Sequence, residues 1–163
     1  MFDDRRREWF GGIVCTAATA VLVMLADDAM AETSRFAVGD ATYQSECGSC
    51  HVAYPPALLG AGTWREIMRG LDKHFGTDAG LGDSAHAQIK AHLEAGAGPS
   101  RREVPTLRIS DASWFRKEHR EIAAATWKSA AVKSPANCGA CHRQADRGDY
   151  GERSLRVPGQ EGK

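Results

Sequence analysis

Cys47-Gly48-Ser49-Cys50-His51 is one of two stretches that decide the fold of this chain, and the other is Cys138-Gly139-Ala140-Cys141-His142. Each has the spacing Cys-x-x-Cys-His, which is that of covalent c-type haem attachment. Two thiols one helical turn apart can both reach the vinyl groups on one edge of a porphyrin, and the next residue places an imidazole under the iron. The sequence therefore predicts two covalently bound haem c groups, held by Cys47, Cys50, His51, Cys138, Cys141 and His142.

Paired cysteines can also serve other purposes. Two pairs can form a structural zinc site, one pair can be a thioredoxin-like redox site, and four exported cysteines can form two disulfides. The zinc and disulfide alternatives do not require a histidine after the second cysteine of both pairs, and a redox pair has no need of a second copy. The motifs therefore favour haem attachment, with zinc as the main alternative.

The N-terminal residues have the pattern of a secretory leader. Three arginines, residues 5–7, precede an uncharged apolar run over residues 11–26, and Ala29-Met30-Ala31 is a small-x-small cleavage pattern. The run of 16 residues is shorter than the roughly 20 needed to span a bilayer. We therefore predict a signal peptide over residues 1–31, which is cleaved after export to the periplasm. Cys15 lies within this leader, so the mature chain keeps only the four motif cysteines.

Composition limits what the mature chain can be. Removal of residues 1–31 from the 163-residue chain leaves 132 residues, with 18 Lys and Arg against 16 Asp and Glu. No patch of one sign indicates a nucleic-acid partner. Aromatic residues make up 7% of the chain and glycines number 17, so a chain of this size would have a thin core. Two buried porphyrins would supply the missing apolar surface, and we expect the apoprotein to be largely disordered.

Two helices are predicted in the first half. Thr63 and Glu66 have capping-box spacing before an apolar row, which predicts a helix over residues 63–75 that ends before Gly76 with His74 at the end of the row. Asp83 or Ser84 can begin the next helix, which Gly96 ends. Residues 32–44, before the first motif, show no strong periodicity and are expected to be a polar lead-in.

The second half is also expected to be helical. Ser110 or Asp111 can cap a helix that bears Phe115, His119 and Ile122 on one face and continues through Trp127 as far as Pro135. The second motif is expected to open another helix, which Gly148 ends.

A stretch rich in Gly, Pro, Ser and Arg, residues 96–105, has the composition of a hinge. We predict an N-terminal haem lobe over residues 32–100 and a C-terminal haem lobe over residues 101–163, whose polar tail from residue 149 is at the surface or partly disordered. No segment alternates at period two. The expected fold is mainly α, a small two-lobed dihaem cytochrome c with little or no β structure, in which the haems form much of the core.

Each iron needs a second axial ligand, whose identity separates electron transfer from small-molecule chemistry. The histidines outside the motifs are His74, His86, His92 and His119. His74 follows His51 by 23 residues and His119 precedes His142 by 23. Both lie on apolar faces of predicted helices, where an imidazole without a partner is unfavourable. The sequence favours His74 for the first iron and His119 for the second.

The other candidates are weaker. His86 and His92 lie on a helix of small residues, where a solvated face is the better interpretation, and His92 is the fallback ligand for the first iron. Met68 is the only methionine after residue 31, so at most one haem could have a methionine ligand. Its place between Trp64 and Leu71 favours core packing.

Residues around the motifs resemble one family. They are Glu46 to His51, Tyr54-Pro55-Pro56, Leu59, Trp64, Met68, Leu71, His74-Phe75-Gly76, Arg108-Ile109-Ser110, Trp114-Phe115, Glu118 to Ile122, and Asn137 to His142. The pattern is similar to that of the bacterial dihaem cytochromes c that are redox partners of the sphaeroides haem protein. The resemblance covers nearly the whole mature chain, and its Tyr-Pro-Pro, His-Phe-Gly and Glu-His-Arg-Glu-Ile pieces are much more specific than the haem motifs alone.

The resemblance implies a periplasmic electron carrier with two low-spin bis-histidine haems close together. It pairs His51 with His74 and His142 with His119. It also implies redox partner proteins, an oxygen-binding haem protein as acceptor or a membrane cytochrome b as donor, and no small-molecule substrate. Propionate contacts could come from Arg101, Arg102, Arg116 or Arg120, which can equally be solvated charges. The alternative is a peroxidase-like or gas-reactive haem enzyme with one open axial position, which carbon monoxide binding would reveal.

Overall fold

The computed structural model describes residue 36 and residues 38–160. This part of the chain contains helices, short 3-10 turns and isolated β-bridges, with no β-strand among the described residues. The prediction of a mainly α protein is therefore confirmed. Within the same residues no helix has the length and apolar character needed to cross a membrane. The predicted leader, including Cys15, lies outside the described residues.

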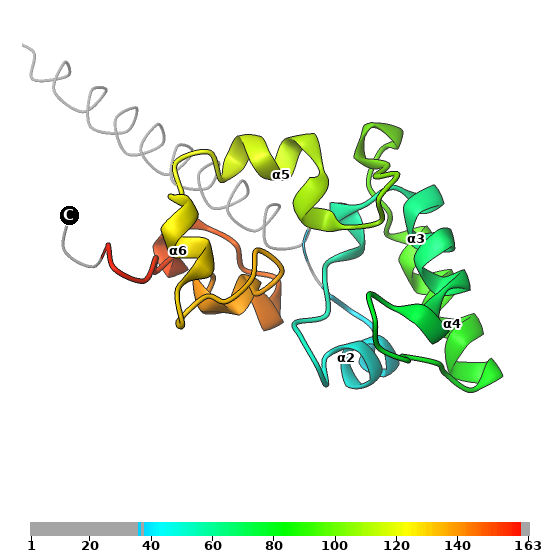
Figure 1. The fold of residues 1–163 in the computed structure, drawn as a ribbon. Helices are drawn as coiled ribbons and strands as arrows, with labels where there is room; N and C mark the ends of the chain where they lie inside the picture. The colour runs from blue at the N-terminus through cyan, green and yellow to red at the C-terminus, as the bar shows by residue number, and fades with distance from the viewer. Residues whose placement is uncertain (1–35, 37, 161–163) are drawn as a thin grey trace, which may run out of the picture. The chain divides into compact units, whose positions relative to one another are not determined.

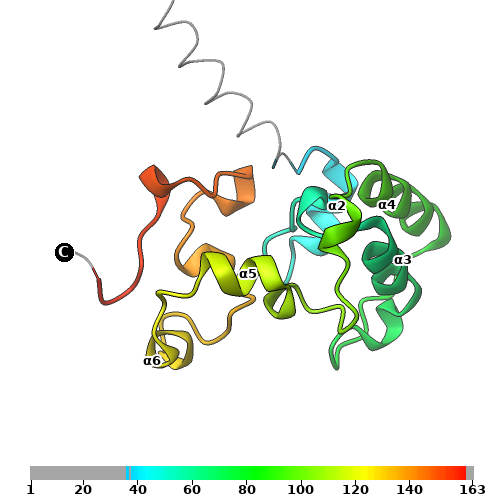
Figure 2. The same cartoon turned by 90° about the horizontal axis from the view of Figure 1, so that it is seen from above.

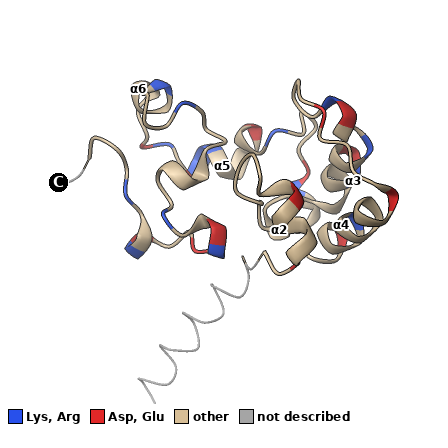
Figure 3. Ribbon diagram, turned by 90° about the horizontal axis from the view of Figure 1, so that it is seen from below, with Lys and Arg blue, Asp and Glu red and all other residues tan. Residues whose placement is uncertain are grey.

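The described residues form five α-helices, all of which are labelled in Figure 1. They are α2 (Ala41–Cys47), α3 (Ala61–Arg69), α4 (Asp83–Ala95), α5 (Ser113–Glu118) and α6 (Ala124–Lys128). Helix α4 packs against both α2 and α3, and these three helices stand together in Figures 1 and 2. Figure 3 shows the same grouping from below, with α5 and α6 beyond it.

Helix α2 leads into the first motif, where the sequence predicted only a polar lead-in. The Asp40 carboxylate accepts a hydrogen bond from the Tyr43 N–H at 2.7 Å and so caps the helix. Gln88 of α4 donates to Asp40 and to Thr42, both at 3.0 Å. Tyr43 is buried, and its hydroxyl donates to the Tyr54 carbonyl at 2.7 Å. A short helix with few apolar residues has little hydrophobic periodicity, so the sequence pattern did not predict this helix.

Helix α3 is shorter than predicted and is capped differently. It begins after Gly60 and ends at Arg69, so the predicted helix over residues 63–75 is wrong at both ends. Glu66 pairs with Arg69 instead of closing a capping box. The helix N-terminus is capped from a distance by Glu103, whose carboxylate accepts from the Gly62 N–H at 2.9 Å and from the Thr63 hydroxyl at 2.7 Å. A tertiary contact therefore replaces the local cap.

Helix α4 ends where the sequence predicted, at Gly96, whose N–H donates to the His92 carbonyl at 3.1 Å. A Cβ atom at Gly96 would lie 2.8 Å from the Pro56 side chain, so the close approach of these segments requires glycine. The predicted N-cap of α4, Asp83 or Ser84, is wrong, because Gly82 holds the N-cap position without a side-chain hydrogen bond. Ile89 and Leu93 of this helix are fully buried.

The second half is less regular than predicted. The single helix expected from residue 110 onward is divided, because α5 ends at Glu118 and α6 begins only at Ala124. Neither Ser110 nor Asp111 caps α5, since Ala112 holds the N-cap position of this helix without a side-chain hydrogen bond. The second motif forms a 3-10 turn over Cys138–Ala140 and not an α-helix. Gly148 ends a further 3-10 turn with a φ of 76°, as its predicted stop role requires.

The hinge-like stretch is bound to the first half. The Gly98 N–H donates to the Leu59 carbonyl at 2.8 Å, and the Gly60 N–H donates to the Arg102 carbonyl at 3.0 Å. The residues from Phe36 onward form one compact unit by their contacts. The boundary near residue 100 between two haem lobes stays a prediction.

The apolar core is unevenly distributed. One cluster of buried residues runs from Val38 to Phe115 and includes Leu59, Trp64, Met68, Ile89 and Leu93. After Phe115, the described buried apolar side chains are only Val132 and Ala145. The second half therefore has little protein core of its own, which fits the expectation that haem supplies much of it.

Candidate functional site

The first motif begins at the end of α2. Cys47 is the last residue of this helix, and Gly48 provides the C-cap N–H to the Gln44 carbonyl. Cys47 is half-buried and Cys50 is exposed. Burial, with Glu46 acting in the same direction, raises the pKa of Cys47 to about 11, so this thiol is protonated at neutral pH.

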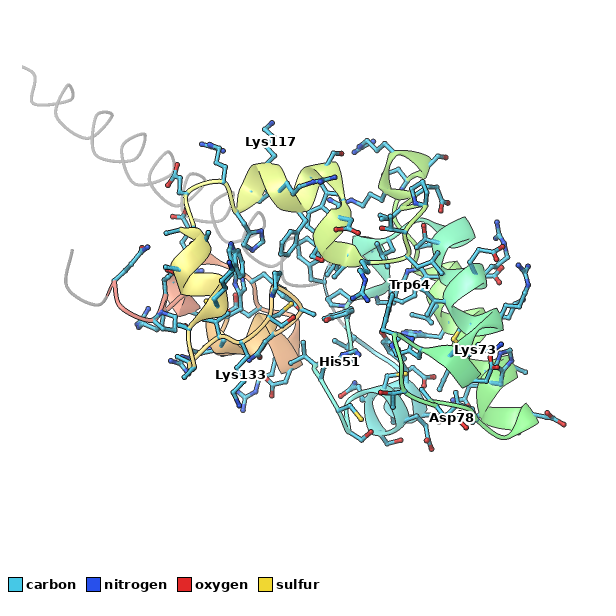
Figure 4. All side chains as sticks on the ribbon, in the orientation of Figure 1. His51, Trp64, Lys73, Asp78, Lys117 and Lys133 are labelled. Atoms are coloured by element: carbon cyan, nitrogen blue, oxygen red, sulfur yellow. The ribbon has the colours of Figure 1, made fainter. Side chains whose placement is uncertain are left out.

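His51 is oriented by its backbone and by an aromatic neighbour. Its Nδ1 lies 2.8 Å from the Val52 carbonyl oxygen. A carbonyl can only accept, so Nδ1 carries the proton and the lone pair of Nε2 is left for a metal. The ring stacks on Tyr54 with 4.7 Å between the ring centroids. Figure 4 labels His51 on the loop that follows α2.

His74 lies after α3 and not within it. The 3-10 turn Leu71–Lys73 follows the helix, and His74 comes directly after this turn. Phe75 next to it has a φ of 51°, an unfavourable left-handed conformation for a bulky residue. Burial lowers the pKa of His74, and the nearby His51 lowers it further. The neutral imidazole, which is the metal-binding form, is therefore favoured.

The ring centroids of His51 and His74 are 6.3 Å apart, with 29° between the ring planes. Two imidazoles on opposite sides of one iron have centroids about 6 Å apart, because each metal–nitrogen bond is about 2 Å and each nitrogen lies about 1 Å from its ring centre. The separation fits an iron between the two rings.

The second motif is held by the C-terminal segment. The Arg156 N–H donates to the Cys141 carbonyl at 2.8 Å, and His142 forms an antiparallel bridge with Leu155. Ser154 in the same segment is buried. The prediction of a surface or partly disordered tail is therefore wrong for Ser154, which is buried, whereas Arg156 is exposed although its N–H binds the motif. Burial raises the pKa of Cys138 to about 11.

His119 stands at the C-cap position of α5, and not in the middle of a long helix. Its Nδ1 lies 2.9 Å from the Phe115 carbonyl oxygen, so Nδ1 donates and Nε2 keeps its lone pair. The ring stacks on the Phe115 ring at 4.0 Å between centroids, and Trp127 lies at 5.7 Å on a tilted plane. The Phe115 carbonyl and the neighbouring aromatic rings together determine the orientation of the His119 ring.

His142, like His119, is half-buried. Burial lowers its pKa, and His119 acts in the same direction, while Asp149 and the backbone of Tyr150 act against them. Nδ1 is buried without a partner in hydrogen-bond geometry. The centroids of His142 and His119 are 6.2 Å apart, with 83° between the ring planes. This pair also has the separation expected of two axial ligands.

The remaining candidates lie outside these pairs. His86 Nε2 donates to the Met68 carbonyl at 2.9 Å, so His86 is not on a solvated face as predicted. His92 packs on Tyr43 with 5.5 Å between centroids and has a buried Nε2 without a partner, which also contradicts a solvated face. Met68 is 3% exposed within the core, as the packing interpretation predicted.

The cysteine alternatives find no support in the geometry of the described residues. The four motif cysteines are free, with no disulfide between them. Within the described part of the chain, no three His, Cys, Asp or Glu side chains converge on a possible metal position. Each cysteine pair is instead followed directly by one histidine of a pair, His51 in one case and His142 in the other.

The residues that support the histidines and connect the two motifs were not predicted from the sequence. Tyr54 stacks on His51, and its hydroxyl donates to the Ala136 carbonyl at 2.7 Å, just before the second motif. Tyr150 lies against His142 with 5.1 Å between ring centroids. The one sequence signal among these contacts was the i, i+4 spacing of Phe115 and His119. Tyr54 and Tyr150 follow their motif histidines by only a few residues, but they stand outside any helical period, and the Tyr54 to Ala136 hydrogen bond joins residues far apart in the chain.

Comparisons with known proteins agree with this geometry. Residues 43–150 match the model of the family described as dihaem cytochrome c. A dihaem cytochrome c structure from Rhodobacter sphaeroides is 40% identical, with 69% of this chain and 98% of that chain covered and a TM-score of 0.62. The structure of a dihaem cytochrome c from Shewanella baltica is 35% identical, with coverages of 73% and 93% and a TM-score of 0.65. No curated protein sequence matches.

The family match spans more than half of the chain and includes both motifs. The resemblance inferred from the sequence is thereby confirmed. Two covalently bound haem c groups follow as the cofactors. On these grounds the chain belongs to the dihaem cytochrome c family.

Proposed function

We propose that this protein is a one-electron carrier in which each haem has two histidine ligands. His51 and His74 bind the first iron, and His142 and His119 bind the second. The observation that carries the proposal is the separation of the paired rings, 6.3 Å and 6.2 Å. A haem with both axial positions filled supplies outer-sphere transfer of one electron and has no open position for a substrate.

The protein prepares the imidazoles for this role. The Val52 and Phe115 carbonyls accept from Nδ1 of His51 and His119 and leave Nε2 directed away from the backbone. Burial lowers the pKa of His74 and His142, which favours their neutral forms. Cys47, Cys50, Cys138 and Cys141 would hold the two porphyrins by thioether bonds.

The location and the partners are part of the same proposal. The leader pattern of residues 1–31 supports export to the periplasm. Family membership implies redox partner proteins. The sequence resemblance supports an oxygen-binding haem protein as acceptor and a membrane cytochrome b as donor. Two imidazoles per iron stabilise the ferric state relative to a methionine-ligated haem, so low reduction potentials are expected.

The test is spectroscopic. A pyridine haemochrome assay should give two haems per chain, and the ferric protein should be entirely low-spin without the far-red band of methionine ligation. The reduced protein should not bind carbon monoxide rapidly. A high-spin ferric signal with rapid carbon monoxide binding at one haem would contradict the carrier and support the haem-enzyme alternative.

A further inference from the structure

Residues 74–77 form a tight turn that begins at the proposed ligand His74. The Thr77 N–H donates to the His74 carbonyl at 3.1 Å. The two central residues, Phe75 and Gly76, have φ values of 51° and 98°. A turn with positive φ at both central residues favours Asn or Gly at the first of them, because a bulky side chain is strained there. Phenylalanine at this position is therefore contrary to the preference of the backbone.

Phe75 does not occupy this position in order to fill the core. The residue is 46% exposed, and it is the only large hydrophobic residue with an exposed side chain in the described part of the chain. Neither the strained backbone nor the exposed ring favours folding. Strained residues of this kind are found often at functional sites, where the surrounding structure holds them in place. The strain therefore suggests a role for the ring itself.

The Phe75 ring has two specific neighbours. The centroids of the Phe75 and His74 rings are 4.8 Å apart with 61° between the ring planes, which is an edge-to-face contact. The Arg108 guanidinium carbon lies 4.4 Å from the Phe75 ring centroid, within the range of a cation–π interaction. One aromatic ring thus contacts both a cation and the imidazole of a proposed axial ligand.

His74 lacks the hydrogen bond that orients two of the other histidines. Nδ1 of His51 donates to the Val52 carbonyl at 2.8 Å. Nδ1 of His119 donates to the Phe115 carbonyl at 2.9 Å. No such bond to the His74 ring is found among the residues that the structure describes. Partners of the second ring nitrogen normally set the orientation of a ligand imidazole, so another contact has to orient His74.

We infer that Phe75 is a positioning residue, whose ring fixes the rotation of the His74 imidazole about the iron–nitrogen axis and is itself held by Arg108. The inference rests on the proposed ligation of the first iron by His51 and His74. It adds the residue that keeps their ring planes near the observed angle of 29°. This angle determines how far apart the two iron orbitals that interact with the imidazoles lie in energy, so Phe75 acts on the haem through its ligand.

The experiment is electron paramagnetic resonance of the ferric holoprotein with three variants of Phe75. Phe75→Asn suits the turn but removes the ring, Phe75→Leu keeps an apolar side chain without a ring, and Phe75→Tyr keeps the ring. Both variants without the ring should lose the sharp rhombic signal of the first haem, which should broaden toward larger g as the imidazole rotates. Phe75→Tyr should retain this signal. The signal of the second haem should be the same in every protein.

The control for the backbone is Lys133→Asn, because Lys133 is also exposed and has a φ of 67°. Arg108→Gln removes the cation beside the ring and should broaden the signal of the first haem. Its control is Lys73→Gln, which removes an exposed cation directly before His74. Lys73 and Lys133 lie apart in the view of Figure 4. Neither control should change either signal.

Circular dichroism and a count of two haems per chain should be the same in all variants, which separates ligand rotation from folding. An unchanged rhombic signal in Phe75→Asn and Phe75→Leu, or equal broadening in Lys133→Asn, would overturn the inference. Two low-spin bis-histidine haems in the unaltered protein would in that case still support the electron carrier. A high-spin first haem in the unaltered protein would instead contradict ligation by His74, and with it the proposed function.

Discussion

At the scale of single residues, the two histidine pairs share a separation but differ in orientation. The ring planes are 29° apart for His51 and His74 and 83° apart for His119 and His142. His51 is oriented by stacking on Tyr54, and His119 is oriented by stacking on Phe115. The two proposed haem sites are therefore electronically different although their ligands are the same.

This difference predicts two distinct low-spin signals. Nearly parallel axial imidazoles separate the two iron orbitals that interact with them, whereas nearly perpendicular ones leave these orbitals close in energy. We expect electron paramagnetic resonance of the ferric protein to show one ordinary rhombic signal, from the first site, and one strongly anisotropic signal at larger g, from the second. Two identical rhombic signals would contradict the ring orientations.

The assignment of His119 predicts the effect of its removal. His119→Ala should leave one iron with an open position, so the ferric protein should gain one high-spin haem and the reduced protein should bind one carbon monoxide per chain. Absorption spectroscopy and carbon monoxide titration measure both effects.

His92→Ala is the matched control, because His92 packs on Tyr43 and its ring belongs to neither pair. This variant should keep both haems low-spin. A high-spin haem in His92→Ala, or none in His119→Ala, would show that the axial ligand is wrongly assigned.

At the scale of elements, helix α3 depends on a residue far away in the chain. Burial raises the pKa of Glu103, but hydrogen bonds from the Thr63 hydroxyl and from the Gly62 and Thr63 N–H groups outweigh it, so the pKa is lowered overall. A Cβ atom at Gly60 would lie 2.4 Å from this carboxylate, so glycine makes room for it. Glu103 thereby ties the segment after α4 to the start of α3.

Glu103→Gln removes the charge of this cap. We expect the holoprotein to lose about 1 kcal/mol of unfolding free energy at neutral pH, as for other helix caps. Because the folded pKa lies below the unfolded value of 4.5, the stabilisation is complete above that pH and is lost as the pH falls through the folded pKa. Denaturant titrations at neutral and acidic pH should show the difference from the unaltered protein narrowing in acid.

Glu66→Gln on the same helix is the control, because its Arg69 partner is exposed. It should change the unfolding free energy by less than about 0.5 kcal/mol. If the two variants behave alike, Glu103 is not the cap of α3.

At the scale of the whole molecule, the two halves differ in how much core the protein supplies. The buried cluster ends at Phe115, and only Val132 and Ala145 are buried apolar residues in the described part beyond it. Trp127, Tyr150 and Phe115 instead surround the second histidine pair. The second half should therefore depend more strongly on its haem than the first.

Removal of one attachment motif at a time measures this dependence. Cys138→Ala with Cys141→Ala should lose the second haem and leave the chain after Phe115 largely unprotected in hydrogen exchange, while α3 and α4 stay protected. Cys47→Ala with Cys50→Ala should leave more helical structure than removal of both haems. Full protection of the second half without its haem would contradict the argument.

The sequence by itself determined the cofactor motifs, the helical class and the four histidines that the structure brings into pairs. Each of these is encoded locally, in a Cys-x-x-Cys-His spacing or in an apolar row, and local spacing is visible in one dimension. The end of α4 at Gly96 was predictable for the same reason, because the stop is a property of the residue at that position.

Tertiary structure alone decided the cap of α3 by Glu103, the break of the second-half helix at His119, the hydrogen bond of Arg156 to the second motif, and the hydrogen bond of Tyr54 to Ala136 just before that motif. The Glu103 and Tyr54 contacts join residues 40 and 82 positions apart, and no local pattern specifies which of many possible partners will meet. The partner of each residue is set only when the packed core and the paired histidines bring distant segments together.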